Sequence, residues 1–167
     1  MNFNYRDFFI HNDDSHIIKE ESSEEDELAQ EFCNKFLQHY KVNTFGSHNC
    51  AWVTQQFINW AKSSKGINAK AIYLVWPDKP NNAGESHIAP IVNNTILDFT
   101  YNQFESFDDC ALLTNVNNWK DVYKKFGYGT NTVNINGKDQ SFIIDTFDNL
   151  ENIKELGIRP DPSLLNV

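Results

Sequence analysis

The stretch SHIAPIVNNTILDFTY, residues 86–101, predicts a β-hairpin. Two short runs rich in β-branched and apolar residues flank Asn93 and Asn94, and asparagine tolerates the positive φ angles that a two-residue turn requires. Pro90 cannot donate a backbone hydrogen bond, so the first run is expected at a sheet edge or beside a bulge. An antiparallel sheet built on this hairpin follows.

The register of the hairpin brings a histidine and an aspartate to one face of the sheet. Counting outward from the turn, Val92 pairs with Thr95, and Ala89 pairs with Asp98. Residues two apart on a strand share a face, so His87 lies diagonally across from Asp98 and within reach of a side-chain contact. A carboxylate beside a histidine fixes the tautomer of the ring and stabilises its charged form.

Helices are predicted before the hairpin. An apolar residue recurs every four positions from Leu28 to Tyr40, which indicates a helix over 25–40. Residues 50–64 predict a second helix, and the apolar run 69–76 predicts a buried strand. Helices that pack on an antiparallel sheet make an α+β domain.

The signals after the hairpin are weaker. Short helices are expected over 106–113 and 117–129, and a last one over 148–157. Between the last two of these helices, Asn136 and Gly137 separate two stretches in which apolar and polar residues alternate, which is a strong signal for a second hairpin.

Length and charge limit the classes of function. The 167 residues suit one domain, which we place at residues 25–167 after an aromatic and acidic extension at residues 1–24. The formal net charge of −9 disfavours nucleic-acid binding, because phosphate contacts need a basic surface. The acidic run 20–27 is expected to be a solvated face. No apolar stretch of the sequence is long enough to predict a membrane span.

The cysteines are Cys33, Cys50 and Cys110, far apart in the chain. An odd number without a CxxC pair predicts neither a disulfide framework nor a zinc site, and Cys33 is expected to be a buried thiol. These features favour a reducing, cytoplasmic location. The N-terminus lacks the pattern of a cleaved signal peptide, so export would need another route.

Cys50 stands in NTFGSHNCAWVTQQFINWAK, residues 43–62, where a loop gives way to the second predicted helix. The positive end of a helix dipole and its free N–H groups favour the thiolate, and the same N–H groups can hold an oxyanion. An inert buried thiol is the general alternative for a lone cysteine. His87 and Asp98 favour the reactive interpretation, because a nucleophile, a base and a group that orients the base make an acyl-transfer site.

The order and setting of these residues, in NCAWVTQQFINWAK, SHIAPIV and ILDFTYNQF, resemble the papain-like cysteine hydrolases in their compact, transglutaminase-like forms. Those forms include papain-fold toxins and protein-glutamine deamidases. The resemblance covers residues 43–104 and implies a papain-like fold, with Cys50 as nucleophile, His87 as general base and Asp98 as the residue that orients the base. It also implies a protein or peptide substrate and no cofactor.

The sequence departs from the papain pattern at the oxyanion donor. Plant-type papains carry a glutamine about six residues before the cysteine, and this chain has Thr44 there. The candidates for the donor are Asn49, Ser47 and the backbone amide of Cys50. Trp52 also replaces the small residues that usually follow the cysteine in that family, and it is a candidate for the cleft.

His48 and Gln103 complete the candidate cleft residues. His48 together with His87 and Asp98 offers the ligand types that transition metals accept. The spacing of His48 and Cys50 is not a usual ligand pattern, so no metal is expected.

The three residues predict a thiol-dependent enzyme that acts on an amide bond, and the resemblance implies a hydrolase, as a protein-glutamine deamidase or a cysteine peptidase of toxin or effector type. Long papain insertions that shape a peptide cleft are absent from the sequence, which favours a small hydrolase or a deamidase. Transfer to another amine, by an acyltransferase or transglutaminase, would use the same three residues. The competing class is a non-catalytic interaction or immunity-type domain whose acidic N-terminus is the binding element.

Overall fold

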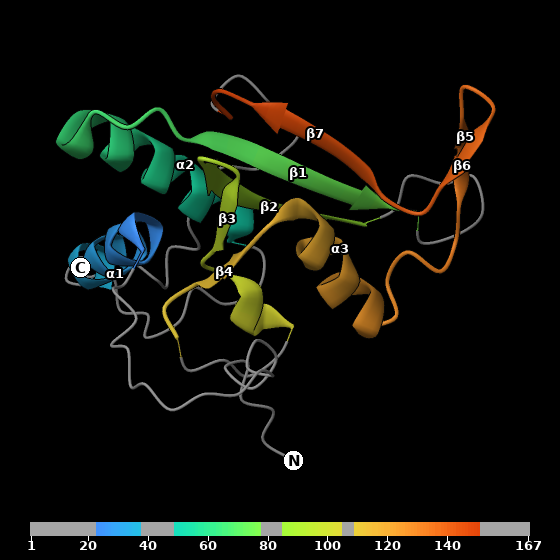
Figure 1. Cartoon of the computed structure of the whole chain (residues 1–167), viewed down its shortest axis with the longest axis horizontal. Helices are drawn as coiled ribbons and strands as arrows, with labels where there is room; N and C mark the ends of the chain where they lie inside the picture. The colour runs from blue at the N-terminus through green and yellow to red at the C-terminus, as the bar shows by residue number, and fades with distance from the viewer. Residues whose placement is uncertain (1–22, 38–48, 78–84, 105–108, 151–167) are drawn as a thin grey trace, which may run out of the picture.

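The described part of the chain forms a five-stranded antiparallel sheet with helices on both faces, and a separate two-stranded hairpin (Figure 1). The computed structural model describes residues 23–37, 49–77, 85–104 and 109–150. The architecture is the α+β class expected from the sequence. In chain order the elements are α1 (Glu24–Leu37), α2 (Cys50–Trp60), the π-helical turn η2 (Ala61–Lys65), β1 (Lys70–Trp76), β2 (Glu85–Val92), β3 (Thr95–Asp98), the 3-10 turn η3 (Tyr101–Gln103), β4 (Leu112–Thr114), α3 (Val116–Lys125), β5 (Val133–Ile135), β6 (Lys138–Gln140) and β7 (Ile143–Phe147).

The turn between β2 and β3 has the predicted conformation. Asn93 and Asn94 have φ angles of +49° and +72°, which suit the right-handed twist of a two-residue hairpin. Only the two residue pairs next to the turn form, the second being Ile91 with Ile96. Beyond these pairs, the described parts of β2 and β3 separate.

Pro90 accounts for this separation. The strand order is β4-β3-β2-β1-β7, so β2 is the central strand. Of the two positions expected for Pro90, a sheet edge or a bulge, the sheet edge is therefore wrong. Pro90 pairs with Ala71 of β1 on one side. Backbone groups alternate in direction along a strand, and in the register set by the turn the missing N–H of Pro90 is one that β3 would have used. The predicted pairing of Ala89 with Asp98 is therefore not made, although alternation still places His87 and Asp98 on one face.

Helices α1 and α2 cover one face of the sheet through an aromatic cluster. The ring of Phe32 in α1 lies 5.2 Å from that of Phe57 in α2 and 4.9 Å from that of Phe99, which follows β3. Ser23 caps α1, because its side-chain oxygen accepts the backbone N–H of Asp26 at 3.2 Å. Helix α2 continues through η2 and ends at Gly66, whose φ of +68° marks the left-handed stop.

Helix α3 covers the opposite face. Its Trp119 and Tyr123 are fully buried, in one cluster with Ile72 and Leu74 of β1. Asn115 caps the helix by accepting the backbone N–H of the residue three positions later, at 3.0 Å. The sheet is thus buried on both faces along β1, β2 and β3.

A disulfide that the sequence analysis did not predict joins α1 to the segment before β4. Cys33 is bonded to Cys110, with their Cα atoms 6.3 Å apart and a separation of 77 positions in sequence. Cys33 is therefore not the buried thiol expected. Its pairing depends on how α1 docks beside β3 and β4, which the number and spacing of cysteines do not reveal. Because two of the cysteines are bonded, the cysteines no longer favour a reducing compartment. The bond itself indicates no particular compartment. No helix among the described residues is long and apolar enough to cross a bilayer.

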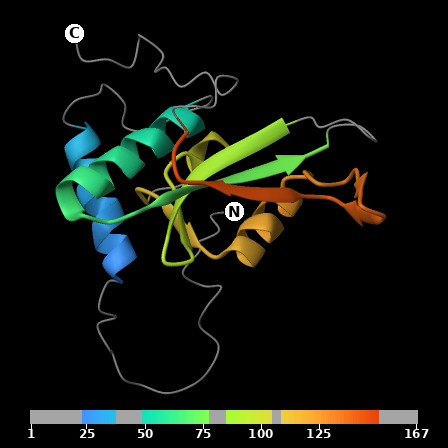
Figure 2. The same cartoon turned by 90° about the horizontal axis from the view of Figure 1, so that it is seen from above.

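The last part of the chain agrees in part with expectation. In place of the helix expected over 106–113, residues 112–114 form the edge strand β4, and Leu97 of β3 pairs with Leu113. The second hairpin is confirmed, since β5 and β6 join at Asn136 and Gly137. Figure 1 and Figure 2 both show this hairpin at the end of the molecule opposite α1.

Two expectations fall on residues that are not described. The extension 1–24 lies outside the described residues except for its last two positions. The final helix expected over 148–157 lies outside them from residue 151 onward, and residues 148–150 form no helix.

Candidate active site

Cys50, His87 and Asp98 form one connected unit. The Nε2 atom of His87 lies 2.9 Å from each carboxylate oxygen of Asp98, and both side chains are buried. The thiol of Cys50, the first residue of α2, is hydrogen-bonded to the His87 ring. Because Nε2 faces Asp98, Nδ1 is the ring nitrogen left for the sulfur. The structure thus brings together the three residues that the sequence singles out.

The separation of β2 from β3 admits the start of α2. The carbonyl of Ile88 accepts a hydrogen bond from Thr54 Oγ1 in α2 at 3.4 Å, and its backbone also bonds the sulfur of Cys50. A longer β3 would have paired with these backbone groups. Helix α2 packs on one face of the sheet while the His87 ring lies among the α3 residues on the other. The opening between the strands is what allows the thiol and the ring to meet.

The Asp98 carboxylate is held by donors from α3 and from Thr100, in addition to His87 of β2. Its Oδ2 accepts from Trp119 Nε1 at 2.9 Å and from the Tyr123 hydroxyl at 3.0 Å, both in α3. Its Oδ1 accepts from the backbone N–H of Thr100 at 3.2 Å. With His87, these bonds satisfy both oxygens of a carboxylate that is 1% exposed. A buried carboxylate with this many donors is stabilised in its ionised form.

Burial and ion pairing act in opposite directions on His87 and Asp98. Burial alone would lower the pKa of His87, but the charge and the hydrogen bond of Asp98 raise it to about 10. Burial alone would raise the pKa of Asp98, but the His87 charge and the donors of α3 lower it below its ordinary 3.8. An imidazolium paired with a carboxylate is the favoured state of these two groups at neutral pH.

The thiol of Cys50 responds to this charged pair. Its half-buried position would raise the pKa of the thiol, but the hydrogen bond and the charge of His87, followed by the backbone of Ile88, lower it below its ordinary 9.0. Asp98 opposes this shift with its negative charge, as the more distant member of the unit. The thiolate is the nucleophilic form, so the shift favours reactivity.

Aromatic rings enclose the imidazole. The ring centroid of Phe104 lies 5.2 Å from that of His87 in an edge arrangement, and those of Tyr123 and Trp119 lie at 5.3 Å and 5.8 Å. His87 has no exposed surface. Exclusion of water strengthens the electrostatic interactions of the imidazolium with the groups on either side.

Helix α2 begins without a side-chain cap. Asn49 is the residue before the helix, 6% exposed, and its side chain makes no capping hydrogen bond. Its carbonyl accepts the N–H of Val53 at 2.9 Å, which is the first bond of the helix. The earlier N–H groups, that of Cys50 included, have no acceptor within the helix. They are therefore candidates for oxyanion donors next to the sulfur.

Of the other candidate cleft residues named from the sequence, Trp52 belongs to the core and three have side chains outside the described part of the chain. Trp52 is buried against Phe36 of α1, with ring centroids 5.2 Å apart, so it belongs to the helix-facing core. Gln103 lies in η3, and its side chain is outside the described part. Ser47 and His48 also lie outside the described residues.

A metal site is not assembled within the described ranges. There, no group of three His, Cys, Asp or Glu side chains is placed to hold a metal ion. His48, the further ligand considered from the sequence, lies outside these ranges.

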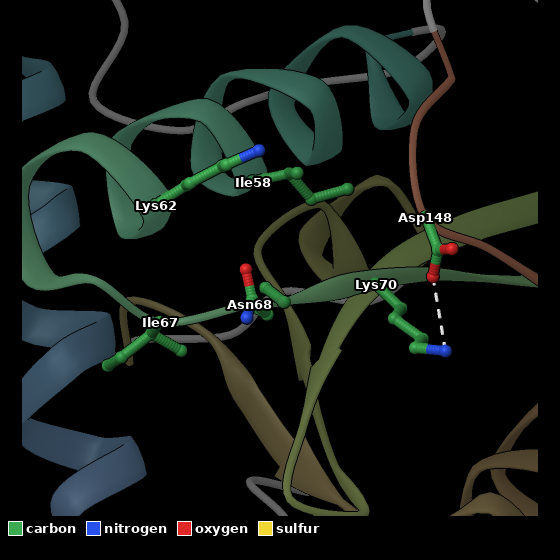
Figure 3. A pocket seen from close by; sticks show the side chains of 7 residues that line it. Ile58, Lys62, Ile67, Asn68, Lys70 and Asp148 are labelled. Carbon is green, nitrogen blue, oxygen red and sulfur yellow. Dashed lines mark ion pairs between the residues drawn. The ribbon is translucent and has the colours of Figure 1, made fainter.

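A pocket of about 360 Å³ lies apart from this unit (Figure 3). It is formed where α2 and η2 end and β1 begins, and Ile58 is eight residues, roughly 12 Å of helix, beyond Cys50. Lys70 on its rim is paired with Asp148 at 3.1 Å, as Figure 3 shows. Both partners are exposed, and the pocket brings no titratable group to the thiol.

Sequence reasoning missed Trp119, Tyr123 and Thr100. The two aromatic residues stand four apart in a segment expected to be helical, and both carry a polar hydrogen. This spacing places them on one face of a helix, but it does not reveal which buried acceptor they meet. Thr100 stands two residues after Asp98, a spacing at which an aspartate commonly accepts the backbone N–H.

Comparison with known proteins adds no assignment. No family model matches the chain, and no curated protein or solved structure is significantly similar to it.

Proposed function

We propose that the protein is a cysteine hydrolase of papain-like type that acts on an amide bond. The observation that carries this proposal is the chain of contacts from the Cys50 thiol through the His87 ring to the buried Asp98 carboxylate. A cysteine at a helix start that packs on an antiparallel sheet agrees with the papain-like resemblance. The resting state in this proposal is a thiolate–imidazolium pair, which needs no separate deprotonation step.

The first half of the reaction forms an acyl-enzyme. The Cys50 thiolate attacks the amide carbonyl carbon, a C–S bond forms, and the carbonyl electrons move to the oxygen. N–H groups at the start of α2 stabilise that oxyanion. His87 then gives its Nδ1 proton to the departing nitrogen, the C–N bond breaks, and ammonia or an amine leaves a thioester on Cys50. Asp98 keeps the ring oriented throughout.

The second half regenerates the thiolate. The now neutral His87 takes a proton from water, and the hydroxide adds to the thioester carbonyl. The C–S bond breaks with its electron pair returning to sulfur, and a carboxylic acid leaves. Deamidation of a glutamine and cleavage of a peptide bond are the two hydrolytic outcomes. If an amine replaces the water, the same residues give the acyltransferase or transglutaminase alternative.

Protein or peptide substrates remain the proposed class, with no nucleic-acid partner. Location stays a prediction. Cys50 needs a compartment that leaves its thiol reduced, whereas the Cys33–Cys110 bond needs one that leaves it oxidised.

Thiol alkylation tests the activated state without a substrate. Under non-reducing conditions, iodoacetamide should label Cys50 alone, because Cys33 and Cys110 are bonded to each other. We expect labelling at neutral pH to be faster than that of an ordinary thiol, and replacing His87 by alanine should abolish the difference. A slow rate that does not respond to the His87 substitution would support the non-catalytic interaction domain instead.

Intact-mass measurement then separates the reactions. Candidate proteins incubated with the wild type should gain about one dalton per glutamine if deamidated, fragment if cleaved, or gain the mass of an added amine if acyl transfer occurs. The Cys50→Ser variant is the matched control and should produce none of these changes. A change produced equally by that variant would contradict the nucleophile assignment.

A further inference from the structure

We propose that Trp119 and Tyr123 of α3 are positioning residues, which hold the Asp98 carboxylate in the orientation and ionised form on which the Cys50–His87 pair depends. The inference rests on the proposed function, because it concerns the same site. It assigns a role in the chemistry to a helix on the far face of the sheet from α2.

The geometry of the carboxylate carries the inference. The Nε2 atom of His87 is 2.9 Å from both oxygens of Asp98, so the carboxylate faces the ring symmetrically. Trp119 and Tyr123 hold the outer side of Oδ2 at 2.9 Å and 3.0 Å, and Thr100 holds Oδ1 through its backbone. Donors on both oxygens fix the plane of the group, and rotation about its last bond would break several hydrogen bonds.

Packing alone does not require these two residue types. Trp119 and Tyr123 lie one helical turn apart, with ring centroids 5.6 Å apart in an edge arrangement, and both are fully buried. Phenylalanine would fill a similar volume at Tyr123 and a smaller apolar one at Trp119, so packing alone requires only a large ring. What the indole and the phenol add is an N–H and an O–H, and both converge on the same buried oxygen. A buried charge depends on such donors, because water does not reach it.

The direction of the effect follows from the charges that face Asp98. The titratable groups are His87 from β2, Cys50 from α2 and Tyr123 from α3, with Tyr101 acting on Tyr123. Removing a donor leaves the negative charge of the Asp98 carboxylate less neutralised. The thiol of Cys50 then ionises at higher pH, and the imidazolium of His87 holds its proton more tightly. The acid limb of the pH profile of Cys50 alkylation, set by the thiol, and the alkaline limb, set by His87, should therefore both move to higher pH.

Tyr123→Phe is the first test, made in the full chain under non-reducing conditions. The rate of Cys50 alkylation by iodoacetamide is measured across a wide pH range. We expect the acid limb to rise by less than about one pH unit, because that is the scale of a hydrogen bond to the titrating group itself, and this bond acts on Cys50 only through Asp98. Tyr128→Phe is the matched control. Tyr128 packs against Tyr123, with ring centroids 6.3 Å apart, and no bond links its hydroxyl to Asp98 among the described contacts. Its profile should match the wild type.

Trp119→Phe provides an independent second variant, which removes the other donor to the same oxygen, and it should shift the profile in the same direction. If either folded variant loses thermal stability while both limbs stay in place, Trp119 and Tyr123 only support the core and the inference is wrong. That result would leave the activated Cys50 of the wild type, and so the proposed function, intact. A wild-type Cys50 without enhanced reactivity would instead overturn the proposed function and this inference together.

Discussion

Replacing Cys50 by serine should change how the stability of the fold depends on pH. The reason lies in the number of protons that the folded and unfolded chains hold. In the fold, His87 has a pKa of about 10 against an ordinary 6.5, and the pKa of Cys50 is lowered from 9.0. Between pH 6.5 and 9.0 the unfolded chain holds one proton on Cys50 and none on His87. The thiolate–imidazolium pair of the proposed site also holds one, so under that proposal the pair adds no slope to stability in this window.

In the serine variant the folded and unfolded chains no longer hold the same number of protons on these two positions. The serine hydroxyl does not titrate, so folded His87 keeps a proton that the unfolded chain has released. A group whose folded pKa is raised contributes stability that is fully present below pH 6.5 and is lost as pH rises through about 10. The charge of Cys50 supplies part of the raised pKa of His87, so in the variant this pKa lies below about 10. Between pH 6.5 and 9.0 the variant should therefore lose at most about 3 kcal/mol that the wild type retains.

Urea unfolding followed by tryptophan fluorescence measures this difference, with the Cys33–Cys110 bond left intact. Subtracting the free energy of unfolding of the variant from that of the wild type at each pH removes the contribution of groups that titrate alike in both proteins. Adding Asp98→Asn to the serine variant is the control, since without the carboxylate the pKa of buried His87 falls and the slope should disappear. If the wild type loses as much stability as the serine variant, Cys50 stays protonated in the fold and the ion-pair argument is refuted.

Three further changes have distinct expected results. Asp98→Asn should slow alkylation of Cys50 at neutral pH by about 10- to 100-fold, because a thiol with its ordinary pKa of 9.0 is only about 1% ionised there. Replacing Cys33 and Cys110 together by serine should lower the free energy of unfolding by about 2–4 kcal/mol in urea, and leave the alkylation rate of Cys50 unchanged. Gln55→Leu removes the acceptor of a buried backbone N–H, bonded at 2.8 Å, and should cost about 1–3 kcal/mol of stability in the same assay.

Matched substitutions make these results interpretable. Asp145→Asn, on the exposed side of the outer strand β7, should leave alkylation unchanged. A wild-type alkylation profile in folded Asp98→Asn would refute the role of that carboxylate. Gln56→Leu, one position along α2 and only half-buried, should cost less than Gln55→Leu. Slower alkylation in the double serine variant would show that the disulfide also shapes the site.

Local sequence signals explain the part of the site that could be predicted. His87 and Asp98 are 11 positions apart on one hairpin, whose turn is set by Asn93 and Asn94. Their shared face follows from strand alternation, which survives even though the strands separate. The helix start at Cys50 was also predictable, because it follows a polar loop and opens an apolar run. Each of these inferences depends on residues close together in the chain.

Long-range docking explains what could not be predicted. Trp119 and Tyr123 reach Asp98 across 21 and 25 positions, and Cys33 meets Cys110 across 77. No periodicity marks such partners. Pro90 predicted either an edge strand or a local break in strand pairing, and the structure has the break. That choice depends on α2, which supplies partners for the backbone that β3 leaves.

The opening between β2 and β3 makes Cys50 an unusual reporter of folding. Most partly buried cysteines react faster when a protein opens, because their sulfur becomes exposed. In the proposed site, Cys50 gains its reactivity from His87, which it contacts while α2 is docked beside Ile88. Undocking of that helix would return an ordinary thiol, protonated at neutral pH. Labelling of Cys50 should then slow as the native structure is lost, so its rate follows the fraction of molecules in which helix and sheet are assembled.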